Sequence, residues 1–156
     1  MTGVRRAGPG DAADVTRLIA GFRDWLTESH PTDAQIAASV ALLLADPNTE
    51  FLLAGDDGPP CGVCQLRYRH SVWTGAPDCW LEDLFVEERA RGAGVGRALV
   101  EAAFDAARAR GARRIELDTN ESNAAALALY ESAGFSAASK THEHLSGRDL
   151  FLGRAL

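Results

Sequence analysis

Long hydrophobic runs, paired cysteines and a secretory leader are all missing from this sequence. Its longest apolar stretches, residues 40–45 and 51–54, are far shorter than the roughly 20 residues of a membrane-spanning helix. Residues 1–10 include two arginines, but no apolar run follows them as it would in a signal peptide. Three cysteines cannot form the disulfide framework of a small secreted domain. These absences predict a cytoplasmic protein with no membrane association.

Positive charge is also scarce, because the formal net charge is −6 and the pI is about 5.2. This balance disfavours nucleic acid as a partner. Residues 1–88 hold 14 acidic and 6 basic side chains, whereas residues 89–156 hold 8 acidic and 10 basic. An acidic first half and a mildly basic second half suit a protein that binds a cation with one half and an anion with the other. Two ordinary solvated faces would give the same counts, so this alternative stays open.

The hydrophobic pattern indicates one α/β domain. The chain has 156 residues, 46% of them hydrophobic, and no linker or internal repeat divides it, so residues 1–156 are expected to form a single domain. Strands are expected over residues 4–7, 51–54, 62–70, 79–86, 114–118 and 149–152. Helices are expected after an Asp11 N-cap, after a capping box at residues 32–35, and over residues 94–110 and 123–132. This order predicts a mixed sheet with helices on both faces.

A glycine-rich turn, Arg91-Gly92-Ala93-Gly94-Val95-Gly96, separates an expected strand from an expected helix. Glycines allow the backbone to approach a ligand with its N–H groups turned inward, and the helix N-terminus adds partial positive charge. Arg89, Arg91 and Arg97 supply further positive charge, so the segment predicts a phosphate-binding site. A tight strand-to-helix connection without a ligand is the alternative interpretation of the same residues.

Two common phosphate-binding loops do not fit this turn. The sequence contains no Gly-x-x-x-x-Gly-Lys-Ser/Thr loop of a nucleoside triphosphatase. A dinucleotide fingerprint requires glycine at the sixth position counted from Gly92, where this chain has Arg97. Asp118 stands near the spacing of a ribose-binding acid, so dinucleotide binding stays open as an alternative.

The segment Arg91-x-x-Gly94-x-Gly96 is similar to the Gln/Arg-x-x-Gly-x-Gly/Ala signature of the GNAT superfamily of acetyl-CoA-dependent N-acetyltransferases. The similarity extends to Leu-Glu-Asp-Leu-Phe-Val at residues 81–86, Asn-Glu-Ser-Asn at residues 120–123 and Leu-Tyr-Glu-Ser-Ala-Gly-Phe at residues 129–135. It covers residues 79–136 and implies the GNAT fold, in which the central strands of a mixed sheet separate to admit acetyl-CoA. It further implies direct transfer of acetyl to a primary amine, with no acetyl-enzyme intermediate and no metal.

The resemblance implies a role for each matching residue. Backbone amides would bind the coenzyme A pyrophosphate, with the Arg97 side chain nearby; they belong to Arg91, Gly92, Ala93, Gly94, Val95 and Gly96. The backbone of Phe85 and Val86 would pair with the pantetheine arm, and an N–H there would polarise the thioester carbonyl. Asn123 would hydrogen-bond the pantetheine, and Tyr130 would protonate the leaving thiolate. A plain helix cap at Asn123 and a buried ring at Tyr130 are the structural alternatives.

The base that accepts the amine proton is a choice between two adjacent acids. Glu82 and Asp83 would face opposite sides of a regular strand, so only one would reach the cleft unless a bulge redirects the other. Their Leu-Glu-Asp-Leu context resembles the polyamine and diamine acetyltransferase branch, which implies Glu82 as the base and Asp83 as an acid that binds the cationic substrate. Salt bridges to Arg67 or Arg69 are the structural alternative.

The function expected from these residues is N-acetylation of a small, cationic, polyamine-like primary amine. A protein or peptide N-acetyltransferase of the same fold is one alternative, and a non-catalytic acetyl-CoA-binding sensor is another. A toxin that acts on charged tRNA is disfavoured by the net charge of −6. A homodimer is expected from family resemblance alone.

Three further pairs of residues are expected to lack a chemical role. The Cys61-x-x-Cys64 spacing resembles a redox or metal pair, but it enters a strand and no further ligands accompany it. His142 and His144 are expected to face solvent, although a place in the substrate cleft is the alternative. Trp73 and Trp80 are expected to pack in the core or in a dimer interface, with an aromatic wall for an amine as the alternative.

Overall fold

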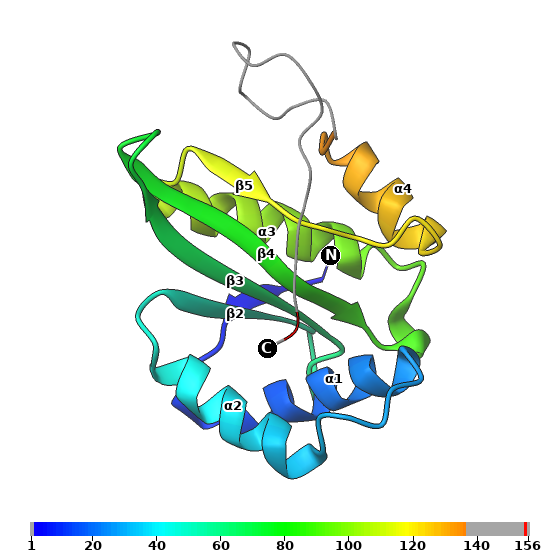
Figure 1. The fold of residues 1–156 in the computed structure, drawn as a ribbon. Helices are drawn as coiled ribbons and strands as arrows, with labels where there is room; N and C mark the ends of the chain where they lie inside the picture. Colours follow the sequence, from blue (N-terminus) through cyan, green and yellow to red (C-terminus); the bar gives the residue numbers. More distant parts are fainter. Residues whose placement is uncertain (1, 137–154, 156) are drawn as a thin grey trace.

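The computed structural model describes residues 2–136 and residue 155, and its centre is a five-stranded sheet in the order β1-β2-β3-β4-β5 (Figure 1). The strands are β1 (Val4–Arg6), β2 (Thr49–Ala54), β3 (Gly62–Ser71), β4 (Ala76–Val86) and β5 (Arg114–Glu116). The pairs from β1 to β4 are antiparallel, whereas β5 runs parallel to β4. The mixed sheet expected from the sequence is therefore confirmed.

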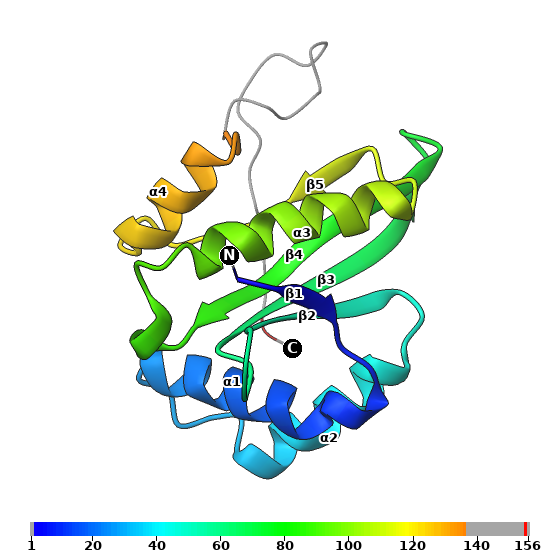
Figure 2. The ribbon, with the colours of Figure 1, turned by 180° about the vertical axis from the view of Figure 1, so that it is seen from behind.

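Helices cover both faces of this sheet, as a comparison of Figures 1 and 2 shows. On one face lie α1 (Ala12–Trp25) and α2 (Asp33–Ala45), and on the other lies α3 (Val95–Ala109). Each face has its own buried core, because alternate residues of a strand point to opposite sides. The last described helix, α4 (Ala124–Ser132), packs beside the start of α3. Short 3₁₀ turns precede α1 and follow β4.

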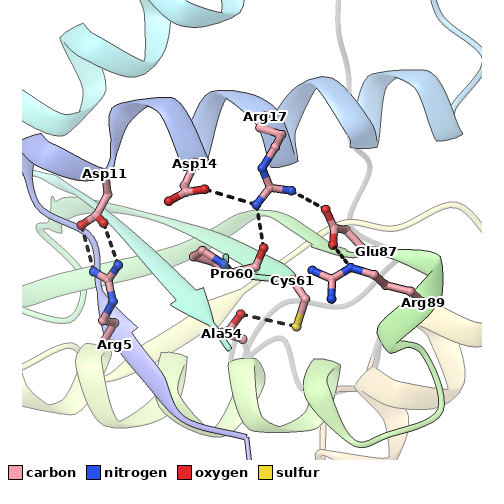
Figure 3. Close-up of polar contacts among 9 residues, drawn as sticks. All are labelled: Arg5, Asp11, Asp14, Arg17, Ala54, Pro60, Cys61, Glu87 and Arg89. Atoms are coloured by element: carbon pink, nitrogen blue, oxygen red, sulfur yellow. Dashed lines mark hydrogen bonds and ion pairs between the residues drawn. The ribbon is translucent and has the colours of Figure 1, made fainter. Parts of the chain in front are cut away.

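The signals for helix starts are confirmed at α2 and wrong in detail at α1. Thr32 Oγ1 accepts a hydrogen bond from the Gln35 N–H at 3.3 Å, and the Gln35 side chain accepts one from the Thr32 N–H at 2.9 Å. Asp11 precedes α1 but makes no side-chain bond to it. Its carboxylate accepts instead from the Gly8 N–H at 2.7 Å and pairs with Arg5 at 2.6 Å (Figure 3). Asp11 therefore fixes β1 to the start of α1 rather than capping the helix.

Strands β4 and β5 stay together over only three residue pairs, Asp78–Arg114, Cys79–Ile115 and Trp80–Glu116. The Arg114 guanidinium donates to the Asp78 carboxylate at 2.8 Å within this paired segment. β5 ends two residues earlier than expected, and the chain then runs toward α4 (Figure 1). Among the described residues no strand pairs with this side of β4 beyond Trp80. The edge of residues 81–86 is therefore open.

Three expectations concern regions away from this edge. The strand expected over residues 149–152 lies outside the described residues, as do His142 and His144. Trp73 is 89% exposed at the β3–β4 turn, so its expected packing in the core is wrong. No helix in the described part of the chain has the length and apolar character needed to cross a membrane.

Candidate active site

A cleft of about 320 Å³ opens beside the free edge of β4. Its lining comes from the end of β4, the segment that joins β4 to α3, the start of α3, and the flanking helices α1 and α4. The lining residues from these elements are Phe22, Trp25, Leu84, Phe85, Val86, Ala90, Arg91, Gly92, Gly94, Val95, Gly96, Arg97, Asn123, Ala125, Ala126 and Leu129. Most of the residues predicted to bind the coenzyme are thus brought together in one place.

The glycine-rich turn forms one end of this cleft. Gly92 and Gly94 have φ values of 77° and 82°, in the left-handed region that side chains with a Cβ rarely adopt. No atom lies within 4 Å of the position that a Cβ would take at either glycine, so both face open space. α3 begins at Val95, and the unpaired N–H groups of its first turn lie at the same end. The turn therefore presents backbone donors and a helix N-terminus to an anion.

Two arginines bring positive charge to this end of the cleft. The Arg91 Nε donates to the Val86 carbonyl at 3.0 Å, and its guanidinium lies 5.4 Å from the centre of the Trp25 ring. Arg97 projects from the first turn of α3 and pairs with Glu101 at 3.1 Å. Since both side chains are among the lining residues, they can reach a phosphate at the turn.

A network of charged side chains fixes α1 to the segment that leads into the turn (Figure 3). Arg17 on α1 pairs with Glu87, which directly follows β4, and donates to the Pro60 carbonyl at 2.7 Å. Glu87 also pairs with Arg89 at 2.7 Å, and Arg17 with Asp14 at 3.3 Å. These contacts hold the entrance to the turn against both α1 and the β2–β3 connection.

The open edge of β4 presents backbone groups to the cleft. The Glu87 N–H donates to the Cys61 carbonyl at 2.9 Å, on the β3 side. Because antiparallel strands alternate the direction of their hydrogen bonds, Phe85 also bonds toward β3, and the N–H and C=O of Leu84 and Val86 face the open edge. Of the two residues whose backbone was predicted to bind pantetheine, Val86 presents its backbone to the open edge, whereas the Phe85 backbone is directed toward β3 and Phe85 still lines the cleft. Leu84 was missed, although the two-residue period of a strand could have indicated it.

Asn123 caps a helix and also lines the cleft, so the structure is compatible with both of the roles considered for it from the sequence. Its Oδ1 accepts a hydrogen bond from the Ala126 N–H at 3.2 Å, so it caps α4. It also lines the cleft. Since the cap uses only the side-chain oxygen, the Nδ2 donor is available to a ligand.

Tyr130 is buried on α4, and its ring meets Phe135 edge-on with centroids 5.8 Å apart. Burial raises the pKa of its hydroxyl to about 12, with smaller contributions from Cys64, Asp83 and Asp118. Tyr130 is not among the lining residues of the cleft, whereas its neighbour Leu129 is. The hydroxyl therefore stays protonated at neutral pH and lies within electrostatic reach of Asp83 on β4.

A β-bulge at Glu82 interrupts the alternation of side chains along β4. Leu81 pairs with Leu66 and Asp83 with Gln65, so Glu82 has no partner on β3. Leu81 and Leu84 both contact the core under α3, a three-residue spacing that a regular strand does not allow. Asp83 consequently faces away from α3, on the side of α2. Neither Glu82 nor Asp83 pairs with Arg67, which lies 4.0 Å from Asp46, or with Arg69.

The two acids differ in their surroundings. Glu82 is exposed, whereas Asp83 is half-buried and lines a second pocket of about 180 Å³ under α2. The pKa of the Asp83 carboxyl is raised to about 6, chiefly by burial and to a smaller extent by the nearby charges of Glu82 and Asp118. A carboxylate with this pKa is ionised at neutral pH and can still accept a proton.

The cleft and the second pocket are neighbours. Asp83 lines the pocket and Phe85 lines the cleft, and both face the same side of β4. On α1, Ile19 lines the pocket and Phe22 the cleft, one helical turn apart. A group that reaches the inner end of the cleft therefore comes close to the Asp83 carboxylate.

None of the three cysteines lines the cleft or the second pocket. Cys64 is fully buried, and burial raises the pKa of its thiol. The Cys61 thiol donates to the Ala54 carbonyl at 3.5 Å. Among residues 2–136, no cluster of His, Cys, Asp and Glu side chains has a geometry that could hold a metal ion.

Comparison with known proteins agrees with this geometry. The sequence model of the Acetyltransferase (GNAT) family matches residues 17–135. This chain belongs to the GNAT acetyltransferase family. Its curated relatives include the aminoglycoside N(6')-acetyltransferase type 1 of Stenotrophomonas maltophilia, 31% identical over 85% of this chain and 84% of the relative. The thialysine N-epsilon-acetyltransferase of Bos taurus is 28% identical over 84% of this chain and 82% of its own length.

Solved structures share the GNAT fold over nearly the whole chain. A crystal structure from Arthrobacter sp. FB24, provisionally assigned as an acetyltransferase, has a TM-score of 0.84 and 31% identity, and covers 99% of this chain and 96% of that one. An aminoglycoside N-acetyltransferase in complex with CoA has a TM-score of 0.78 at 21% identity, and covers 100% and 96%. The protein is thus an N-acetyltransferase of the GNAT kind, a family that uses acetyl-CoA.

Proposed function

We propose that this GNAT enzyme transfers an acetyl group from acetyl-CoA directly to the primary amine of a small cationic substrate. The observation that carries the proposal is the position of the half-buried Asp83, where the coenzyme cleft meets the pocket under α2. The acidic first half of the chain attracts a cation to this pocket. Two relatives are named for acetylation of nitrogen atoms on an aminoglycoside and on thialysine.

The cleft residues have distinct roles toward acetyl-CoA in this proposal. Backbone N–H groups of residues 91–96 bind the pyrophosphate, and Arg91 and Arg97 offset its charge. Asn123 Nδ2 donates to a carbonyl of the pantetheine arm. The Val86 carbonyl, which accepts from Arg91 here, becomes an acceptor for a pantetheine amide once Arg91 turns toward the phosphates.

Asp83 is the proposed base, and Glu82 helps to attract the cation. This reverses the two roles that resemblance to the polyamine branch implied. The reason is that Asp83 lines the pocket and has a pKa of about 6, whereas Glu82 is exposed at the bulge. An ammonium group has a pKa near ~10.4 and must lose a proton before nitrogen can attack, and a base whose pKa lies close to the working pH serves this step.

Proton and charge movements are assigned to three groups. Asp83 accepts the proton that the ammonium group loses before its nitrogen attacks the thioester carbonyl. The second proton leaves the nitrogen after the C–N bond has formed, and it replaces the proton that Tyr130 gives to the thiolate. A backbone N–H of Leu84 or Val86 donates to the thioester oxygen, on which negative charge develops. As the C–S bond breaks, the Tyr130 hydroxyl gives its proton to the thiolate, and its raised pKa keeps that proton in place until then.

Release of coenzyme A thiol from acetyl-CoA tests the proposal. The purified protein would be assayed with 1,5-diaminopentane, spermidine, thialysine, an aminoglycoside and short peptides. Asp83→Asn and Glu82→Gln form a matched pair, since each removes one charge from adjacent residues. We expect turnover of a small amine to fall by about 10²–10⁴-fold in Asp83→Asn and far less in Glu82→Gln.

Other outcomes would point elsewhere. A larger loss of turnover in Glu82→Gln than in Asp83→Asn would assign the role of base to Glu82. Turnover of peptides alone would favour a peptide N-acetyltransferase, and saturable acetyl-CoA binding with no turnover of any amine would favour a sensor. Formation of a homodimer and a cytoplasmic location stay predictions.

A further inference from the structure

Gln65 on β3 lies directly opposite Asp83 on β4, at the last regular pair before the bulge. Both side chains line the pocket under α2. Side chains that oppose each other in this way have Cβ atoms about 4.5–5.5 Å apart. A carboxamide and a carboxylate thus stand next to each other on one wall of the pocket.

Neither side chain has a hydrogen bond or ion pair within the part of the chain that the structure describes. Gln65 is only 5% exposed, and its carboxamide has unused donors and an unused acceptor. A buried polar group without a partner costs free energy, and most such groups in proteins are satisfied. An unpartnered carboxamide aimed into a pocket beside a carboxylate therefore points to a polar ligand group between them.

The other walls of the pocket limit the shape of that ligand. They are formed by the apolar side chains of Ile19, Ile36, Val40, Leu43 and Phe51. Pro31 and Ser39 are exposed and mark the mouth, while Asp83 lies on the side toward the coenzyme cleft. A volume of about 180 Å³ with apolar sides, open at the mouth and acidic at the other end, suits a short chain of methylene groups that ends in a cation.

We propose that Gln65 is a specificity-determining residue that, with Asp83, receives the ammonium end of an unbranched aminoalkyl chain. Gln65 Oε1 accepts one N–H while Asp83 accepts another, so the nitrogen is held at the end of the pocket nearest the thioester. The apolar walls contact the methylene groups that follow it. This inference rests on the proposed function and adds the acceptor's shape and the residue that selects it.

Steady-state kinetics with 1,5-diaminopentane test the role of Gln65. Ser71→Ala on the same strand is the control, because Ser71 lines neither the cleft nor the pocket under α2. Gln65→Met keeps length and removes the acceptor, so the KM for the diamine should rise about 10- to 100-fold, while the KM for acetyl-CoA stays within about twofold of the parent. Gln65→Glu restores an acceptor and should return the KM for the diamine to near the parent value. The carboxylate added beside Asp83 should also raise the pKa of Asp83, so the acid limb of the kcat/KM profile should move to higher pH.

Three results would overturn the inference while leaving the proposed function intact: an unchanged KM for the diamine in Gln65→Met, no rescue by Gln65→Glu in a folded protein, or equal turnover of aminocyclohexane and 1-aminopentane by the parent. We expect the unbranched amine to be preferred at least about tenfold. If the parent binds acetyl-CoA and acetylates no amine, the proposed function fails and the inference fails with it.

Discussion

Leu81 and Leu84 are three residues apart on β4, yet both contact the core under α3. The bulge at Glu82 makes this possible. In a regular strand Leu84 would face the side opposite to Leu81, and the extra residue at the bulge returns it to the side of α3. The bulge also leaves Asp83 on the side where α1 and α2 pack. The chemistry proposed for Asp83 thus depends on an irregularity in the backbone next to it.

The first prediction concerns the pH dependence of turnover. Asp83 must be ionised to accept a proton, and its pKa is raised to about 6, so kcat/KM should fall about tenfold per pH unit below pH 6. Glu82→Gln removes a nearby negative charge that contributes to the raised pKa, and should move this limb to lower pH. A limb that stays in place in Glu82→Gln would contradict the electrostatic coupling of the two acids.

The second prediction concerns stability. Because the pKa of Asp83 is raised by folding, its ionisation opposes the folded state as pH rises from about 4 through 6. Asp83→Asn should therefore increase the free energy of unfolding by about 1–3 kcal/mol at pH 8 and change it little at pH 4, while it removes activity. Denaturant unfolding at the two pH values measures this. Asp105→Asn, at an exposed site on α3, should show no such difference between them.

Much of the fold was predictable because its signals are local. The capping box at residues 32–35 and the apolar run of β2 before its turn depend on neighbours in sequence. The glycine turn was predictable since two of its residues need a left-handed backbone, and Asn123 since a capping residue precedes a helix. Resemblance to a family then assembled these parts into one site.

The rest depends on contacts between distant segments. Asp11 satisfies the pattern of an N-cap, but Arg5 and the Gly8 N–H compete for its carboxylate. A bulge is set by the register between two strands, so the side on which Asp83 lies relative to Leu81 could not be read from β4 alone. Gln65 carries no motif, and its importance follows only from its position opposite Asp83.

The third prediction concerns Tyr130, and the other tyrosine of the chain supplies its control. Tyr130→Phe keeps the ring and its edge contact with Phe135 but removes the proposed acid, so kcat should fall about 10²-fold or more across the working pH range. Tyr68→Phe also removes a buried hydroxyl, at a position that lines neither hollow, and should retain the parent kcat. An unchanged kcat in Tyr130→Phe would reject its role as the acid.

The fourth prediction concerns the charged network that precedes the glycine turn. Arg17→Met removes the contacts of α1 with Glu87 and with the Pro60 carbonyl, so the segment before the turn should be held less firmly. Since the side chains of Arg17 and Glu87 are partly exposed, the free energy of unfolding should change by less than about 1 kcal/mol. The effect should appear instead as an increase of about 2- to 10-fold in the Kd of coenzyme A, measured by calorimetry, because a displaced turn aligns its N–H groups less well.

Arg108→Met is the matched control for this fourth variant, since Arg108 pairs with Asp105 at 3.4 Å on the exposed side of α3, away from the cleft. It removes the same charge and a similar ion pair, so a general electrostatic effect on an anionic ligand would weaken coenzyme binding equally in both variants. A local positioning effect would weaken it only in Arg17→Met. If both variants bind coenzyme A like the parent, the network fixes α1 without positioning the turn.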